Sequence, residues 1–417
     1  YNIFVVDQQF NQNSSVSFIN TNVTRNGHFR DANVTGLLAD LTTKKNTYNL
    51  EAELKMSNVN LESGTETGYS YKLELAKVFG NWQYWVGHEF ADDTYDINDL
   101  GLQFRNNFSN FGAELSYRTF EPTGIFNSYN FNSWVDYSRL SNPSTYTGSN
   151  IGMAFSGQLK SLHGFGGNVS FQPGKQYDYF EPREEGRYFI FENRINGNIW
   201  FSSNYNKKFA LDGNVGGATF FEDDRDTNNI WFGISPRVRF NDKLLLIYSF
   251  DYDKVNGNRG YADSTADAII FGNRDRKTMI NSITGSYSFN PFHTLNLTFR
   301  KYWSTVLYDD NIYLLQENGR LLETDITFED AGLDDPNINF STWNLDLSYS
   351  WQFAPGSFLT ALYRNQLFNY DSEAELNFTN NFDRLLKQPI QNSFSIKIQY
   401  FIDYNNVKKI FNKKSDS

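Results

Sequence analysis

The chain has 417 residues, no cysteine, and 48 acidic against 37 basic side chains, for a formal charge of −11. The acidic surplus argues against a nucleic-acid partner, which requires a basic surface, and the absence of cysteine excludes disulfides and thiolate metal sites. Mean hydropathy is −0.57, and no run approaches the 18 apolar residues that a membrane helix needs.

Apolar and polar residues alternate in segment after segment along the chain. Successive side chains of a strand point to opposite faces, so each segment predicts a strand with one apolar and one polar face. The pattern predicts strands at 1–10, 14–24, 32–43, 46–57, 66–79, 81–91, 110–121, 126–138, 146–160, 163–173, 186–201, 207–220, 228–240, 242–254, 276–290, 292–305, 340–353, 357–370 and 391–402.

Two of these strands carry residues that disfavour regular pairing. Pro236 cannot donate to a ladder, which predicts a bulge within 228–240. Six glycines between Gly148 and Gly167 predict a weakly specified part of the sheet.

The clearest alternation is in 343–353, where odd-numbered residues are Trp, Leu, Tyr or Phe and even-numbered ones are Asn, Asp, Ser or Gln. Ten steps of about 3.3 Å, tilted by about 40°, span about 25 Å, the apolar band of a membrane barrel. Because Trp and Tyr favour the rims of that band, aromatic belts are expected to include Trp82, Trp85, Trp200, Tyr302 and Trp303. Taken singly, an aromatic residue is more often wall packing than a sugar platform.

Tight turns alternate with longer polar connections, and in outer-membrane barrels the short turns are periplasmic and the long loops extracellular. Residues 101–107 are assigned to a long loop rather than to a strand. The predicted long loops are 25–31, 58–65, 92–109, 139–145, 174–185, 221–227, 255–275, 306–339 and 371–390.

These features predict an all-β, antiparallel transmembrane β-barrel of about 19–20 strands over 1–404, in the outer membrane of a Gram-negative bacterium. A basic periplasmic tail at 405–417 is expected to follow, with Lys408, Lys409, Lys413 and Lys414. Nineteen strands is an odd number, whereas single-chain bacterial barrels have an even one. At least one upstream strand is therefore expected to be missing or to come from another chain.

The inward face of such a barrel is polar, and a lumen of this width needs water, a plug or inward-folded loops to fill it. The loops 306–339 and 371–390 are the candidates. Mutual pairing of the charges across the lumen is favoured over a selectivity filter. The residues expected to face the lumen are Glu51, Glu53, Lys55, Lys72, Glu74, Glu114, Arg118, Glu192, Arg194, Arg237, Arg239 and Asp346.

Catalysis is not expected. There are four histidines: His28 and His88 are predicted toward the extracellular end, with Asp31, Asp92 and Asp93 as candidate neighbours, and His163 and His293 at periplasmic turns. No HExxH or GxSxG string occurs.

Neither a cofactor nor a metal site is expected. Residues 251–258 resemble a calcium loop, but Asn256 occupies the position that requires glycine. The acidic runs at Glu222, Asp223, Asp224 and Asp226, and at Asp334 and Asp335, are interpreted as solvated loops.

Two stretches resemble a family of membrane-embedded C-terminal barrels in long, uncharacterised Gram-negative outer-membrane proteins. They are residues 1–47, beginning YNIFVVDQQFNQNSSVSFINTNVT, and INDLGLQFRNNFSNFGAELSYR at 97–118. The resemblance implies a family-9-like carbohydrate-binding sandwich and barrel-like sequence upstream, and some members are described as membrane-associated hydrolases. It implies no catalytic motif in this chain.

Three functions remain open. The first is a barrel that anchors a binding domain and passes or handles glycan- or peptide-like material. The second is a structural subunit that docks other outer-membrane or periplasmic chains, and the third is a membrane-associated hydrolase using His28 and His88. In all three, outer-membrane lipid and lipopolysaccharide are expected partners.

Overall fold

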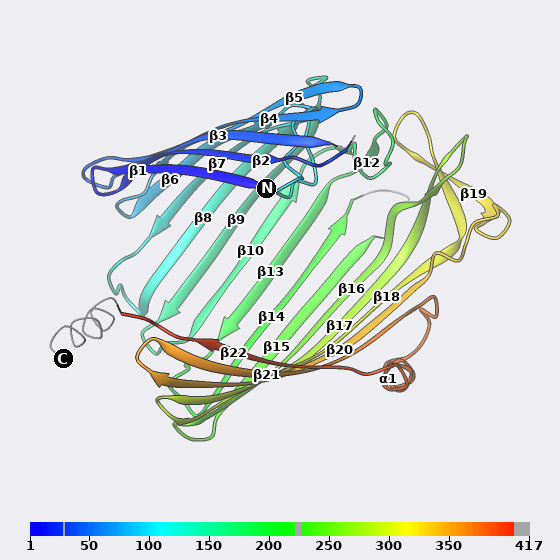
Figure 1. Ribbon diagram of the computed structural model, residues 1–417. Helices are drawn as coiled ribbons and strands as arrows, with labels where there is room; N and C mark the ends of the chain where they lie inside the picture. Colours follow the sequence, from blue (N-terminus) through cyan, green and yellow to red (C-terminus); the bar gives the residue numbers. More distant parts are fainter. Residues whose placement is uncertain (28–29, 222–226, 404–417) are drawn as a thin grey trace. The chain divides into compact units, whose positions relative to one another are not determined.

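The structure, a computed structural model, describes residues 1–27, 30–221 and 227–403 (Figure 1). The described chain is all-β apart from one short helix, and it divides into two compact units. Among the described residues, unit 1 contains 1–199, 218–221 and 315–322, and unit 2 contains 200–217, 227–314 and 323–403.

Unit 1 is an antiparallel meander in which each strand from β1 to β10 pairs with the next along the chain. A small hairpin, β11–β12, follows, and then the first part of β13. The bounds are β1 (Asn2–Phe10), β2 (Ser14–Val23), β3 (Asp31–Thr42), β4 (Tyr48–Leu61), β5 (Gly64–Lys77), β6 (Trp82–Ala91), β7 (Phe108–Arg118), β8 (Phe126–Arg139), β9 (Tyr146–Leu159), β10 (Gly164–Gln172), β11 (Gln176–Asp178), β12 (Phe189–Phe191) and β13 (Arg194–Ser202).

Unit 2 is also antiparallel, with β15 to β18 paired in sequence, β18 paired with β20, and β20 to β22 paired in sequence. Besides the last part of β13, the elements that lie wholly or partly in it are β14 (Phe209–Phe220), β15 (Asn228–Arg239), β16 (Leu244–Ser264), β17 (Ile269–Asn290), β18 (His293–Leu315), β19 (Leu321–Thr327), β20 (Ile338–Ala354), β21 (Ser357–Asp371), α1 (Phe378–Leu386) and β22 (Gln391–Gln399).

The sheet of unit 1 has one apolar and one polar face, because directly opposed residues share a face. Leu37 of β3 opposes Leu54 of β4, which opposes Tyr71 of β5. The next positions along the strands put Leu38, Glu53 and Lys72 together on the other face. Leu37 and Leu54 are 48% and 59% exposed, so the apolar face is not buried against a second layer.

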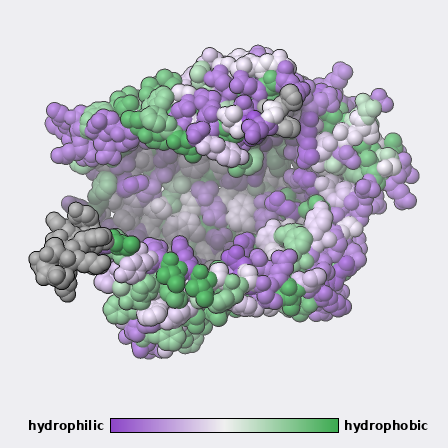
Figure 2. Space-filling view, viewed as in Figure 1, coloured by the Kyte–Doolittle hydropathy of each residue, from purple (hydrophilic) through white to green (hydrophobic). Residues whose placement is uncertain are grey.

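Unit 2 has the same two-faced construction. One register line joins Leu297, Leu347, Tyr363 and Phe394 on β18, β20, β21 and β22. Phe394 is 66% exposed, and Figure 2 shows hydrophobic side chains at the surface over β22. A water-soluble sheet would bury this side.

The predicted strands correspond to long strands of the structure except 186–201, which divides into the three-residue β12, paired with β11 in a separate small sheet, and β13. Residues 101–107 are not a strand, as predicted. The predicted loop at 255–275 is wrong, because β16 continues to Ser264 and β17 begins at Ile269. Register shifts between Val255 and Asn258 and between Tyr261 and Asp263 interrupt the alternation there, which conceals the strands from a two-residue pattern. Likewise, β18 extends to Leu315 and β19 lies within the predicted loop 306–339.

The bulge predicted at Pro236 is also wrong. Ile234 pairs with Phe250 and Arg237 with Ile247, which is one continuous register. Pro236 therefore removes a backbone donor without inserting a residue into the strand.

Among the described residues of each unit, β1 pairs with β2 and β22 pairs with β21. Every residue of both strands is exposed. Barrel closure and an additional strand stay predictions. Within the described residues there is no helix with the length and hydrophobicity needed to span a bilayer.

Candidate functional site

The polar face of unit 1 carries five of the predicted charged residues on β4 and β5. Lys72 Nζ lies 2.9 Å from Glu74 Oε1 and 3.9 Å from Glu51 Oε2, and Lys55 forms an ion pair with Glu53. The two lysines and three glutamates thus largely neutralise one another across the strand pair.

Two tryptophans flank a glutamate on the same polar face. Trp85 of β6 opposes Glu114 of β7, and Glu114 in turn opposes Trp134 of β8. The strands that carry the two tryptophans are two strand spacings apart, or about 9.6 Å. Both are partly exposed. We call Trp85, Glu114 and Trp134 the tryptophan array.

Glycines allow both rings of the tryptophan array to lie against the sheet. A Cβ atom at Gly87 or Gly112 would come within 2.5 Å and 2.6 Å of the Trp85 ring, and one at Gly152 within 2.1 Å of the Trp134 ring. Larger residues there would lift the rings off the backbone. The glycine-rich segment that the sequence marked as weakly specified therefore supports a defined aromatic surface.

Part of the prediction of aromatic belts is wrong. Trp85 lies on the polar face, whereas Trp82, three residues earlier, lies on the apolar face and is 55% exposed. Tyr302 is likewise on the polar face, next to Arg300, and Trp303 is buried rather than exposed at a rim. The reason is strand parity: an odd spacing reverses the face.

The remaining predicted residues of unit 1 are dispersed. Arg118 opposes Asn130 on β8. Glu192 forms an ion pair with Arg320, and the Arg194 guanidinium lies 5.5 Å from the centre of the Phe220 ring.

In unit 2, Asp346 accepts two hydrogen bonds of 2.7 Å from Arg364. Arg237 stacks 4.8 Å from the Tyr205 ring, and Arg239 opposes Leu245 at the end of β15. These residues lie on the polar faces of their strands.

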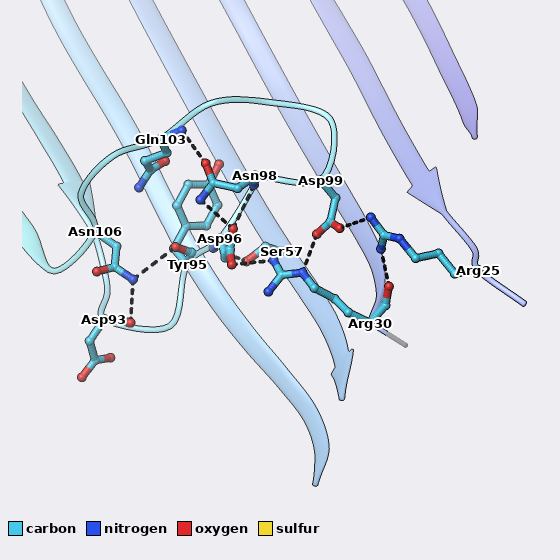
Figure 3. A network of polar contacts seen from close by, with 10 residues as sticks. All are labelled: Arg25, Arg30, Ser57, Asp93, Tyr95, Asp96, Asn98, Asp99, Gln103 and Asn106. Atoms are coloured by element: carbon cyan, nitrogen blue, oxygen red, sulfur yellow. Dashed lines mark hydrogen bonds and ion pairs between the residues drawn. The ribbon is translucent and has the colours of Figure 1, made fainter. Parts of the chain in front are cut away.

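A loop at 92–107 folds onto the polar face of β4 and β5 (Figure 3). Tyr95 is only 3% exposed, and a Cβ atom at Gly68 of β5 would lie 2.2 Å from the Tyr95 Cα. The backbone N–H of Asp96 donates to Ser57 Oγ of β4 at 3.0 Å. The sequence did not predict that this loop packs on the polar face, because its contacts are with residues distant in sequence.

Two arginines from the connection between β2 and β3 hold this loop in place. Asp99 accepts from Arg25 Nη2 at 2.8 Å and from Arg30 Nε at 2.9 Å, and Arg30 Nη2 lies 2.5 Å from Asp96 Oδ2 (Figure 3). The Asp99 side chain is 6% exposed. We call Arg25, Arg30, Asp96 and Asp99 the loop latch.

Electrostatics in the latch favour the charged forms. The hydrogen bond to Asp96 raises the pKa of Arg30 above its ordinary value. Burial acts to raise the pKa of Asp96, but hydrogen bonds from Arg30 and Asn98 outweigh it and leave that pKa below its usual range. Burial, reinforced by the charge of Glu53, raises the pKa of Tyr95 to about 12, so its phenol stays neutral.

The loop 371–390 does not fold onto the polar face, contrary to expectation. Its helix α1 packs on the face of β20 that bears Trp343 and Leu345, where Phe382 stacks on Trp343 at 5.9 Å. Leu385 is fully buried and Asn381 donates to Asn339 Oδ1 at 2.7 Å. Asn339, near the end of this face, thus gives the helix a polar partner for hydrogen bonding.

No catalytic arrangement forms around His88. Its ring stacks on Phe111 at 3.9 Å, and Nε2 lies 2.9 Å from Ser109 Oγ, but no described carboxylate contacts it. Asp31 accepts from the Arg25 backbone, Asp92 from the Tyr69 backbone and Asp93 from Asn142. His28 lies outside the described residues.

The two remaining histidines lie beside turns. His163 contacts Ser161, and His293 contacts Tyr349 and stacks on Trp351. Neither has a described acid beside it.

Across the described residues, no group of three or more His, Cys, Asp or Glu side chains is arranged to hold a metal ion. Residues 251–258, the weak calcium-loop match, belong to β16, with Gly257 at a bulge where its N–H donates to Asp275. The acidic run at 222–226 and the lysines of the tail at 405–417 lie outside the described residues.

Unit 2 contains a cavity of about 650 Å³ beside the extended β18 strand. Its lining combines Tyr308 and Phe328 with the carboxylates of Asp309, Asp310 and Asp334. Phe328 belongs to a small core with Ile270 and Ile312, which stabilises the strand extensions.

The fold and the polar face define a two-faced, all-β protein. The sequence model of one family, Domain of unknown function (DUF5916), matches residues 1–411, so the chain belongs to this family. No curated protein matches the chain. Among solved structures it is similar to OmpT, an outer membrane protein of Vibrio cholerae folded in vitro, with 10% identity, coverage of 95% of this chain and 99% of that chain, and a TM-score of 0.32.

Proposed function

We propose that this chain is an outer-membrane β-barrel whose polar face binds and passes glycan-like material. Support for the membrane assignment comes from the exposed apolar face of each unit. Alternation of an apolar, lipid-facing side with a polar, inward side is the pattern of a transmembrane barrel. Closure of the strands around a lumen is part of the proposal.

The proposal that the ligand is a glycan rests on the tryptophan array. An aromatic ring held flat offers a face to the C–H groups of a sugar ring, and the Glu114 carboxylate can accept hydrogen bonds from sugar hydroxyls. Sites of this kind combine aromatic walls with a few placed polar groups. The acidic surroundings, which include Asp136 beside Gly112, favour neutral or amino sugars over acidic ones.

The loop latch supports a controlled passage. The 92–107 loop occupies part of the polar face that solutes would otherwise contact, and two arginines fix it there. Release of the loop is expected to increase access to that face.

The ligand class is tested with full-length protein in detergent, titrated calorimetrically with maltohexaose and with a chitosan hexasaccharide. Replacing Trp85→Leu or Trp134→Leu should weaken binding about tenfold each, equivalent to about 1.4 kcal/mol. Trp82→Leu is the matched control, since it lies on β6 but on the apolar face. Glu114→Gln tests the polar contact without disturbing the rings.

Equal affinities for all four variants and the unaltered protein would refute the glycan assignment, as would an absence of binding to either sugar. Single-channel recording in a planar bilayer tests passage separately. If the bilayer does not conduct although folded protein is inserted, the proposal of a channel is refuted. The proposal of glycan binding is then judged by the calorimetry alone.

A second candidate is a structural subunit that docks another chain by strand pairing. The fully exposed β1 and β22, each with one partner within its unit, favour it, since unpaired strand edges are templates for pairing. Purification of the full protein from mild detergent as a lone monomer would count against this candidate.

A further inference from the structure

Two lysines oppose each other on the apolar face of unit 2. Lys254 of β16 pairs with Lys277 of β17 in the same register that pairs Tyr252 with Met279 and Phe250 with Asn281. Both lysines are partly buried. They therefore stand at the end of the apolar stretch of β16, on the side proposed to face lipid.

Like charges directly opposite each other destabilise a strand pair, and no described acidic side chain neutralises these two. Their neighbours on this face across β15 and β18 are Ile230 and Thr305. The nearby Asp253 pairs with Arg276 on the polar face. Among the described residues, no carboxylate lies within ion-pair distance of Lys254 or Lys277.

The surroundings position one of the lysines. Lys277 Nζ lies 4.6 Å from the centre of the Trp303 ring, a cation–π contact. Trp303 is held by a 3.0 Å hydrogen bond from its Nε1 to Asn339 Oδ1 and by the Phe378 ring of α1. Asp371, on the same face but three strands away, is engaged by Arg384 and Asn339.

We propose that Lys254 and Lys277 bind the phosphate of an anionic lipid headgroup at the rim of the apolar face. A phosphate between the two ammonium groups would relieve their repulsion with charge-assisted hydrogen bonds. The lipid's acyl chains would cover the apolar residues Phe250 and Tyr248 below. Basic residues adjoining a membrane-facing apolar surface attract anionic lipids in this way. The inference rests on the membrane-spanning part of the proposed function, and not on its glycan ligand.

The test uses the full chain, purified in neutral detergent and stripped of lipid. Three probes are added: diphosphorylated lipid A, the same lipid with both phosphates removed, and inorganic phosphate. Retention of lipid is measured by native mass spectrometry, and the melting temperature by intrinsic fluorescence. The variant is Lys254→Gln with Lys277→Gln, and the control is Lys243→Gln, in the exposed turn before β16.

The unaltered protein and the control should retain the phosphorylated lipid, and it should raise their melting temperature. The dephosphorylated lipid should be retained at least tenfold less. The double variant should lose both effects, yet melt higher than the unaltered protein when no lipid is present, because its repulsion has been removed. That opposite shift distinguishes loss of a site from loss of folding.

Equal retention of phosphorylated lipid by the double variant and the unaltered protein would overturn the inference. Full stabilisation by inorganic phosphate alone would show a site for a free anion and would also overturn it. If glycan binding fails while lipid retention behaves as expected, the glycan assignment falls and the lipid site stands.

Discussion

At the scale of single residues, Asp99 is the centre of the loop latch. One nearly buried carboxylate bonds two arginines that lie outside its own loop, so it joins segments far apart in sequence. Removing one partner of such a group leaves the other charges without compensation.

Asp99→Asn is therefore expected to release the loop. The chain has no cysteine, so Phe104→Cys, at an 87% exposed position, offers a single site for a spin label. The label should become more mobile in the Asp99→Asn background, as measured by electron paramagnetic resonance. Asp93→Asn is the control, since Asp93 is exposed and its side chain accepts from Asn142 rather than from the arginines. Equal mobility in both backgrounds would contradict the latch.

The same label reports the pH dependence of the latch. Because the pKa of Asp96 is lowered in the folded protein, its contribution is complete above the ordinary carboxyl value of about 3.9. That contribution is lost as the pH falls through the lowered pKa. Mobility should thus stay constant from pH 7 to about pH 5 and rise only in stronger acid. A rise centred near pH 6 would point to a different group.

At the scale of elements, glycine and tryptophan act as a pair across strands. Trp134 covers Gly152 of β9 so closely that a Cβ there would lie 2.1 Å from the ring. An aromatic ring over a cross-strand glycine supplies the packing that glycine lacks and fixes strand register.

Gly152→Ala should lower the free energy of unfolding by about 1–3 kcal/mol, because it overpacks this contact. In a Trp134→Ala background the same change should cost much less, since the clashing ring is gone. Urea unfolding in detergent, followed by tryptophan fluorescence, completes the double-mutant cycle. Additive effects of the two changes would show that the ring does not rest on Gly152.

At the scale of the whole molecule, the proposed function depends on whether lipid or water covers the apolar face. Leu37 and Leu38 are adjacent on β3 but face opposite sides of the sheet. If lipid covers the apolar face, Leu37→Lys should destabilise the folded protein by up to about 2–4 kcal/mol, and Leu38→Lys by much less.

The two variants are compared after assembly into phosphatidylcholine vesicles. Heat-dependent mobility in gel electrophoresis measures assembly, and urea titration measures stability. If water covered Leu37, a lysine at this half-exposed position would be harmless, and Leu38→Lys would be the more damaging change. That result would remove the membrane assignment.

The sequence by itself determined the secondary structure and the two faces, because an alternation of period two depends only on neighbouring residues. It located strand after strand and left 101–107 out of the sheet. It failed where bulges break the alternation, as between Val255 and Asn258, and at Pro236, where a missing donor did not disturb the register.

Only the tertiary structure decided which side chains meet. Trp85, Glu114 and Trp134 come from three strands, and Asp99 reaches Arg25 across 74 positions of sequence. Parity fixes the face of a residue within its strand, but its neighbours depend on the register between strands. That register is set by long-range backbone pairing, which no local pattern contains.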